Sequence, residues 1–377
     1  MHRRHFLKLL AIAASGPAVS TAARAADAKI GPLRADPDGV LDLPDGYRYN
    51  VVSKAGDRMN DGLRVPEAHD GMAAFPGDDG RIVLICNHEI APSNFAGCAY
   101  ADRYRKLPQV IRENIYDHGR GKTPGAGGTT PTVYNPRTGA TERQHLSLAG
   151  TELNCAGGPT PWGSWLSCEE CFESPGMGLS GGRLVHREMH HGYVFEVPAS
   201  ATGLVEPRPI KAMGKFEHEA AAVHAATGIV YMTEDRHHSL FYRYLPDVPG
   251  KLHEGGKLQC LAVQDAPSMM THNWSREPSI IPGESLPVRW IDLEDVDPVE
   301  NDLRLRGETI GAATFARGEG LTAAGDEFAF TCTIGGPARL GQVFSYRPSA
   351  HEGQPGETGD PGQLTLLAEA TDESILR

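Results

Sequence analysis

Short stretches of β-branched and aromatic residues alternate with turn residues along most of the chain. The sequence contains 44 glycines and 28 prolines, which interrupt nearly every apolar stretch after a few residues. Such punctuation is typical of short strands joined by turns, and it leaves little room for long helices. A brief helical segment is expected over residues 103–116. The pattern predicts strands over residues 81–86, 163–168, 192–197, 228–233, 240–244, 327–333 and 341–346.

Four of these strands resemble one another and form a weak internal repeat. They read IVLICNHE (82–89), GSWLSCEE (163–170), GIVYMTED (228–235) and EFAFTCTI (327–334). Each runs from an apolar stretch into Thr, Ser or Cys, and the first three then end in one or two acids. Recurring strands with matching endings are typical of propeller blades. We therefore predict an all-β, β-propeller-like fold of about six blades with short helical insertions. A β-sandwich of the same strands is the alternative.

The acidic strand endings are the first candidate functional groups. A single glutamate at a strand end is ordinarily just solvated, and that explanation suffices for each one taken alone. In a propeller the first strand of every blade faces the central channel, so similarly placed endings are expected to meet there. Carboxylates brought together would repel one another, and their pKa values would rise. Bound cations relieve this repulsion, and carboxylate oxygens suit Ca²⁺ or Fe³⁺. The three endings are Asn87-His88-Glu89, Glu169-Glu170 and Glu234-Asp235.

Two further segments add candidate ligands. Glu217, His218 and Glu219 place two carboxylates around an imidazole, although the same residues would also suit a charged helix start. Cys155 lies in an Asn-Cys-Ala-Gly-Gly turn, where glycine lets the backbone approach a ligand closely. A free cysteine is usually a small core residue. Beside carboxylates, however, its thiolate is a ligand for a redox-capable metal.

The segment FARGEG (315–320) brings an arginine and an acid together at a glycine-rich strand entry. Arg317 and Glu319 would suit an ordinary ion pair. If Glu319 binds a metal, Arg317 is carried to the same site, and its planar guanidinium suits a phosphate group. A phosphate dianion approaches a nest of carboxylates only after metal ions and an arginine have reversed the local charge.

The first 25 residues have the pattern of a twin-arginine export signal. The pair Arg3-Arg4 precedes an apolar, small-residue run over 9–23, and residues 23–25 offer a small-x-small cleavage site. A short buried N-terminal helix is the alternative. We expect residues 1–25 to be removed after export by the twin-arginine translocase, and residues 26–377 to form one propeller domain. The predicted location is the periplasm or the medium, with no stable membrane anchoring, because no segment is apolar enough to span a bilayer.

Charge and cysteine content narrow the range of partners. The formal net charge is −12, whereas nucleic acid and anionic membrane surfaces both need a basic surface to bind. We therefore expect no nucleic-acid partner. Seven cysteines, an odd number spread over a large chain, do not suit a disulfide scaffold. Cys168 and Cys171 form a C-x-x-C pair without a second such pair, which disfavours a zinc ribbon. A local disulfide and two packed thiols remain as alternatives.

Several long motifs resemble the PhoX-type alkaline phosphatases. They are NHE (87–89), GGTTP (127–131), NCAGGPTPWGSWLSCEE (154–170), HGYVFEV (191–197), KFEHEAAAV (215–223), VYMTED (230–235), FYRY (241–244) and RGEG…FTCTIGG (317–336). The resemblance implies a twin-arginine-exported, six-bladed propeller-like enzyme with an oxo-bridged cluster of Fe³⁺ and Ca²⁺. It implies that Cys155 is an iron thiolate and that Arg317 holds the substrate phosphate. The carboxylate ligands that it implies are Glu89, Glu170, Glu219, Asp235 and Glu319.

The resemblance predicts a metal-dependent phosphatase that hydrolyses small phosphate monoesters with a metal-bound oxide or hydroxide. The alternatives are a calcium-dependent propeller hydrolase of phosphodiesters, phosphotriesters or lactones, and a non-catalytic metal-binding propeller. Similar sequences continue, past the point that corresponds to Arg377, into a Pro-Asp-Asn segment and a strand ending in Cys-Glu-Asp. We therefore expect a fragment with a truncated C-terminal blade, a propeller that closes differently, or an inactive protein.

Overall fold

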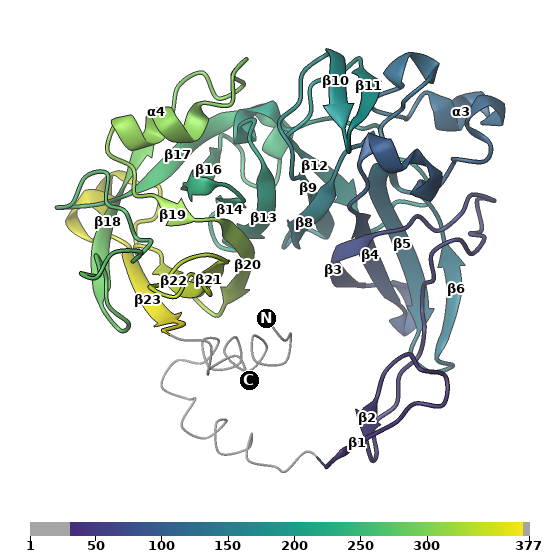
Figure 1. Ribbon diagram of the computed structural model, residues 1–377, viewed down its shortest axis with the longest axis horizontal. Coiled ribbons are helices and arrows are strands. Elements are labelled where there is room, and N and C mark those ends of the chain that lie inside the picture. Colours follow the sequence, from purple (N-terminus) through teal and green to yellow (C-terminus); the bar gives the residue numbers. More distant parts are fainter. Residues whose placement is uncertain (1–30, 372–377) are drawn as a thin grey trace.

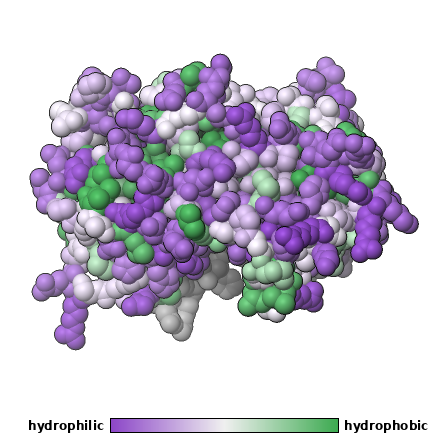
Figure 2. All heavy atoms as spheres, turned by 90° about the horizontal axis from the view of Figure 1, so that it is seen from above, coloured by the Kyte–Doolittle hydropathy of each residue, from purple (hydrophilic) through white to green (hydrophobic). Residues whose placement is uncertain are grey.

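The computed structural model describes residues 31–371, and nearly all of its regular elements are short antiparallel strands (Figure 1). The all-β prediction is confirmed. The predicted export signal lies outside the described residues, so the domain boundary near residue 25 stays a prediction. Among residues 31–371, no helix is long and apolar enough to cross a membrane. Hydrophilic residues cover most of the face shown in Figure 2, with hydrophobic residues in small separate patches.

All of the predicted strands form. They are β4 (Ile82–His88), β9 (Ser164–Glu169), β12 (Val194–Pro198), β14 (Val230–Glu234), β16 (Phe241–Pro246), β21 (Glu327–Cys332) and β22 (Gln342–Arg347). The helical prediction over 103–116 is only partly confirmed, because Pro108 separates the 3-10 turn η3 (Tyr104–Lys106) from the one-turn helix α3 (Gln109–Arg112). A second helix, α4 (Leu303–Thr309), was not predicted.

The remaining strands were not predicted. They are β1 (Leu33–Arg34), β2 (Leu43–Pro44), β3 (His69–Pro76), β5 (Gly127–Asn135), β6 (Ala140–Gln144), β7 (Leu148–Thr151), β8 (Asn154–Pro159), β10 (Gly176–Ser180), β11 (Arg183–Arg187), β13 (His218–Val223), β15 (His237–Ser239), β17 (Gly256–Val263), β18 (Ser285–Asp292), β19 (Phe315–Ala316), β20 (Gly318–Ala324) and β23 (Gln363–Glu369). Further 3-10 turns are η1 (Asp78–Gly80), η2 (Pro92–Gly97), η4 (Gly119–Gly121), η5 (Lys211–Met213), η6 (Leu252–Glu254) and η7 (Pro355–Gly359).

These strands form four blades in the described part of the chain. Blade A is β3-β4-β5-β6, blade B is β8-β9-β12, blade C is β13-β14-β16-β17, and blade D is β20-β21-β22-β23. Strand β18 pairs with both β17 and β23, so it joins blades C and D into one continuous sheet. The four blades are antiparallel throughout, and they account for four of the about six blades that we expected.

The strand that faces the axis differs from our expectation. Strands β3, β8, β13 and β20 lie side by side around the centre of the molecule, and β8 packs against both β3 and β13 (Figure 1). The repeated strands β4, β9, β14 and β21 are therefore the second strands of their blades and not the first. The inner strands escaped prediction because they are rich in Gly and Ala, as in NCAGGP of β8 and GEGLTAA of β20, and have no regular alternation.

The apolar core lies between neighbouring blades and not along the axis. Between blades B and C, Leu166 and Val194 pack with Val230 and Met232. Between blades C and D, the rings of Phe241 and Phe330 stack with their centroids 4.4 Å apart. Burial of these side chains holds the blades together, and it leaves the axis to polar residues.

Blades B and C approach so closely that a side chain would not fit between their inner strands. A Cβ atom on Gly158 of β8 would lie 1.9 Å from the carbonyl oxygen of Ala221 in β13. We expect Gly158→Ala to lower the free energy of unfolding by about 3 kcal/mol, because overpacking forces the two strands apart. Gly203→Ala is the matched control, since nothing lies within 4 Å of its added Cβ. Equal urea midpoints for the two variants would contradict the close packing.

Candidate metal centre

Each of the four inner hairpins has a β-bulge at the same place, where the strands reach the axis. The last regular pairs are His69↔His88, Asn154↔Glu169, His218↔Glu234 and Gly318↔Cys332, and the register shifts directly after each of them. A bulge bends its strand and redirects a side chain, which is why bulges occur so often beside functional sites. The first residues of the four bulges are Asp70, Cys155, Glu219 and Glu319.

A second set of side chains follows the outer strand of each hairpin. Glu89, Glu170 and Asp235 come directly after β4, β9 and β14. Each therefore lies beside the bulge of its own blade. In blade D the matching residue is the exposed Thr333, and Arg317 instead adds its side chain just before the bulge. The bulge of each of the four blades thus supplies one potential metal ligand. In blades A, B and C, the acid that follows the second strand supplies another.

The ligand atoms of these residues lie close together. Those of Asp70, Glu89 and Cys155 are all within 4.8 Å of one another, and so are those of Cys155, Glu170 and Glu219. Cys155 belongs to both groups, and its Sγ lies 3.9 Å from Asp70 Oδ1. The structure therefore brings acids from blades A, B and C around one thiol.

Asp235 and Glu319 extend this cluster toward blade D. The carboxyl group of Asp235 lies close enough to those of Glu170 and Glu319 to raise the pKa of both. All six predicted ligands, five acids and one cysteine, thus lie together at the axis.

Arg317 lies at the edge of the cluster and is held by one of its acids. Its Nε donates to Asp235 Oδ1 at 2.6 Å, and its Nη2 donates to Asp235 Oδ2. Nη2 also lies 3.6 Å from Glu319 Oε1. The side chain is 37% exposed, so the rest of the guanidinium faces solvent. Arg317 forms the ion pair expected of an ordinary surface arginine and still has donors available for an anion.

Burial, and then the charges of neighbouring acids, raise the pKa values of several groups at the axis. Burial raises the pKa of Glu170 to about 8, and a hydrogen bond from the protonated Glu170 carboxyl to Asp235 and the charge of Asp235 add to the shift. Burial and the charge of Asp235 raise the pKa of Glu319 to about 7. The pKa of Glu219 lies well above its ordinary value, chiefly because of burial and then because of the charge of Glu319. Burial and the charge of Glu219 also raise the pKa of the Cys155 thiol.

The donor set fits a cluster of cations. Glu219 is 5% exposed, and its buried Oε2 has no hydrogen-bond partner within residues 31–371. Such an oxygen is costly to bury unless a proton or a cation satisfies it. Carboxylate oxygens are the ligands that Ca²⁺ prefers, and a thiolate among them adds affinity for iron.

A family model described as alkaline phosphatase PhoX matches residues 28–132 and 128–375. The chain belongs to the PhoX alkaline phosphatase family. The resemblance seen in the motifs is thereby confirmed. Comparison with curated protein sequences gives no match.

The fold is similar to that of a solved member of the family, Pseudomonas fluorescens PhoX in complex with vanadate, a transition-state analogue. The TM-score is 0.58 at 19% sequence identity, and the match covers 88% of this chain and 74% of that one. This similarity supports the propeller-like fold, which had been predicted from the internal repeat.

Asp70 is the one residue of the cluster at the axis that our sequence analysis missed. Its signal is the triplet His-Asp-Gly (69–71), which matches the three bulge triplets Asn-Cys-Ala, His-Glu-Ala and Gly-Glu-Gly. In all four, an acid or a thiol is followed by a small residue. Gly71 shows why the small residue is needed, because a Cβ there would lie 2.7 Å from the Cα of Ala156.

The neighbouring acids and histidines of the motifs point away from the axis, because successive side chains of a strand face opposite sides. Glu169 binds His191 Nδ1 at 2.7 Å, and Glu234 accepts a hydrogen bond from Tyr242 at 2.9 Å. His88 Nε2 lies 2.8 Å from Thr130 Oγ1. These residues support the strands that carry the cluster and do not belong to it. The segment that begins at Glu217 leads into strand β13 and does not start a helix.

All seven cysteines are free thiols. Cys168 and Cys171 are buried and unpaired, so the second alternative for the C-x-x-C pair, two packed thiols, describes them. Only Cys155 lies in the cluster described above.

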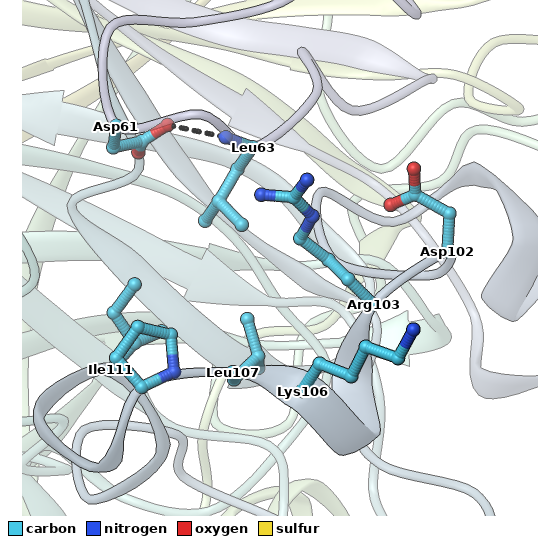
Figure 3. Close-up of a pocket in the computed structure, with 8 residues that line it drawn as sticks. Asp61, Leu63, Asp102, Arg103, Lys106, Leu107 and Ile111 are labelled. Carbon is cyan, nitrogen blue, oxygen red and sulfur yellow. Dashed lines mark hydrogen bonds between the residues drawn. The ribbon is translucent and has the colours of Figure 1, made fainter.

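A hollow of about 400 Å³ lies near η3 and α3, far in sequence from most of the cluster (Figure 3). Arg103, Lys106, Asp61 and Asp102 line it together with apolar residues, and Asp61 already accepts a hydrogen bond from the Leu63 backbone at 2.9 Å. It includes no residue of the acidic cluster. We therefore do not place the functional site there.

The raised pKa values predict how the metal-free protein responds to pH. An unfolded glutamate titrates near 4.5, whereas folded Glu170 and Glu319 titrate near 8 and 7. The folded state thus binds more protons between these values, and stability falls as pH rises from 4.5 to about 8. Urea unfolding after chelation, at intervals across this range, measures the effect. Glu170→Gln should flatten the profile, and calcium should restore stability at pH 8. A flat profile for the metal-free wild type would contradict the crowding.

Proposed function

We propose that the chain is a metal-dependent phosphatase that hydrolyses phosphate monoesters outside the cytoplasm. The observation that carries the proposal is the convergence of four bulges on one cluster, with Arg317 at its edge. Membership of the PhoX alkaline phosphatase family supports phosphatase chemistry. The solved relative in complex with vanadate, a transition-state analogue, supports the same interpretation.

We assign cation binding, with Fe³⁺ and Ca²⁺ as the ions, to the thiol and the acids of the cluster. The proposed ligands are Asp70, Glu89, Cys155, Glu170, Glu219, Asp235 and Glu319. Bound cations would supply Lewis-acid polarisation of the ester oxygens and a nucleophile at moderate pH. In the metal-free chain, burial holds protons on Glu170, Glu219 and Cys155. Loading is therefore expected to release these protons.

Arg317 supplies the recognition of the phosphoryl group. Nε and Nη2 of Arg317 both donate to Asp235, so the guanidinium is positioned before substrate arrives. Its solvent-facing donors suit the oxygens of a phosphoryl group, on which negative charge grows during the reaction. Within an acidic protein, this cation at the rim makes the approach of a phosphate ester to the cluster electrostatically possible.

Hydrolysis of an aryl phosphate by the purified protein tests the proposal. We expect release of the phenol, loss of this activity after chelation, and recovery on adding calcium. A diester and a lactone serve as comparison substrates, and faster turnover of either would favour a calcium-dependent hydrolase of another specificity. Bound cations without turnover of any of the three would indicate a non-catalytic propeller.

We further propose export by the twin-arginine translocase, on the evidence of Arg3, Arg4 and the small-residue run that follows them. Replacing both arginines by lysine is expected to leave the protein in the cytoplasm. Cell fractionation of the two forms decides this, and equal export of both would contradict the assignment.

A further inference from the structure

We propose that Asn87 is a positioning residue, which fixes from blade A the bulge of blade B that carries Cys155. The consequence for cation binding rests on the proposed function, whereas the structural role does not. Asn87 belongs to the motif Asn-His-Glu, in which only Glu89 has so far been given a function. The side chain of Asn87 is 0% exposed and lies between the two blades.

The bulge of blade B leaves part of its backbone without partners in the strand ladder. Asn154 pairs with Glu169 and Gly157 pairs with Ser167, so Cys155 and Ala156 lie between two regular pairs. Residues inside a bulge lose regular ladder hydrogen bonds. The carbonyl groups of these partly buried residues therefore need another donor.

Asn87 supplies that donor. Its Nδ2 donates to the carbonyl oxygen of Cys155 at 3.2 Å and to that of Ala156 at 2.6 Å.

The oxygen of the Asn87 side-chain amide also has hydrogen-bond partners. This atom, Oδ1, accepts hydrogen bonds from Trp165 Nε1 and Ser167 Oγ, both at 2.8 Å. An indole nitrogen only donates and a carbonyl only accepts, so this is the one orientation of the amide that satisfies all four contacts. Asn87 thus uses its full hydrogen-bonding capacity on blade B.

The position of Asn87 in the chain links two members of the cluster. It lies two residues before Glu89, and it binds the backbone of Cys155 directly. Glu89 and Cys155 come from different blades but belong to the same group of ligand atoms within 4.8 Å. Asn87 therefore fixes their separation across the blade boundary.

A similar side-chain hydrogen bond links blade C to the bulge of blade D. Thr233 lies two residues before Asp235, as Asn87 does before Glu89. Its Oγ1 donates to the carbonyl oxygen of Glu319, in the bulge of blade D, at 2.7 Å. It also accepts a hydrogen bond from the backbone of Ala220, in the bulge of blade C, at 3.2 Å. Thr331, at the matching place in blade D, makes no side-chain hydrogen bond within residues 31–371.

Hydrogen exchange of the metal-free protein tests this role without any reference to cations. Asn87→Asp keeps the acceptor and the size of the side chain but loses both donors. We expect amides of residues 154–158 to exchange at least roughly tenfold faster, because each lost buried hydrogen bond changes a local opening equilibrium by about that factor. Thr233→Val should have the same effect on residues 318–321. Thr331→Val is the matched control and should leave both segments at wild-type rates.

The outcomes separate this inference from the proposed function. Wild-type exchange over 154–158 in a folded Asn87→Asp variant overturns the role of Asn87. If that variant does not fold, the test passes to Thr233→Val. Wild-type exchange over 318–321 in that variant would then overturn the proposed role of cross-blade hydrogen bonds in fixing the bulges. Iron and calcium content is the second readout, and it should fall in both variants but not in Thr331→Val. If the wild type itself bound neither metal, the proposed function would fail while the exchange result would still decide the inference.

Discussion

Replacing Glu219 by glutamine is expected to remove most of the bound iron and calcium and to slow phosphate ester hydrolysis by more than about 100-fold. Mutation of a residue that only hydrogen-bonds to a metal ligand typically lowers metal affinity or activity by about 10–100-fold. Loss of a direct ligand should therefore lower them further. Glu219 lies in the bulge of blade C beside Cys155, and its Oε2 has no partner among the described residues. The measurements are metal content by mass spectrometry and the rate on an aryl phosphate.

Glu217→Gln is the control for this variant. Glu217 is also buried, lies two residues earlier, and likewise has an Oε2 without a hydrogen-bond partner among the described residues. Its Oε1, however, accepts from Asn301 Nδ2 at 2.8 Å and pairs with Arg236 at 3.4 Å, and Glu217 belongs to neither group of clustered ligand atoms. We expect this variant to keep its metals and most of its activity. Full metal content in Glu219→Gln, or equal losses in the two variants, would contradict the assignment of the ligands.

Replacing Arg317 by alanine is expected to lower the rate on an aryl phosphate by about 10²–10³ while metal content stays near that of the wild type. The physical reason is the loss of a preorganised cation where charge develops, which costs about 2.7–4 kcal/mol for comparable groups. Arg317→Lys keeps the charge but loses the planar fork, so an intermediate rate is expected.

Arg236→Ala controls for the general loss of a positive charge. Arg236 directly precedes β15, which pairs with β19, and its backbone carbonyl accepts a hydrogen bond from the backbone of Arg317. Its side chain is about half-exposed and pairs with Glu217. Its replacement should change the rate little, since its only ion pair among the described residues is with Glu217, which lies outside the cluster. An Arg317→Ala protein that retained full activity would rule out the phosphate-binding role.

The strands that pack between blades could be predicted from the sequence because burial on both faces requires β-branched and aromatic residues. The apolar stretches before Glu89, Glu170 and Asp235 are of this kind, and all three strands form. The repeat of their endings then indicated a common centre. The segment FARGEG added Arg317 and Glu319 as candidates, and the family resemblance then implied their roles.

The inner strands and the bulges could not be predicted in the same way. The inner strands face a polar axis and pack against each other, which selects glycine and alanine and erases the alternation of strand residues. A bulge depends on pairing between strands, so sequence periodicity does not reveal that Asp70 is redirected to the axis. Comparison of the triplets before each repeated strand would have found it.

The residues of the cluster come from equivalent positions in the four blades. Each blade brings a bulge residue to the axis from its first strand, and blades A, B and C add an acid from the end of the second strand. Cross-blade hydrogen bonds from Asn87 and Thr233 hold neighbouring bulges in place. Burial and then the proximity of other acids raise the pKa values of Glu170, Glu219 and Glu319, and cation binding would offset that electrostatic cost.

The metal content of the purified, undialysed protein tests the central claim most directly. Inductively coupled plasma mass spectrometry, normalised to protein concentration, should find both iron and calcium, with more than one cation in total for each chain. Protein that contains neither iron nor calcium, although it is folded and was never exposed to a chelator, would contradict the account.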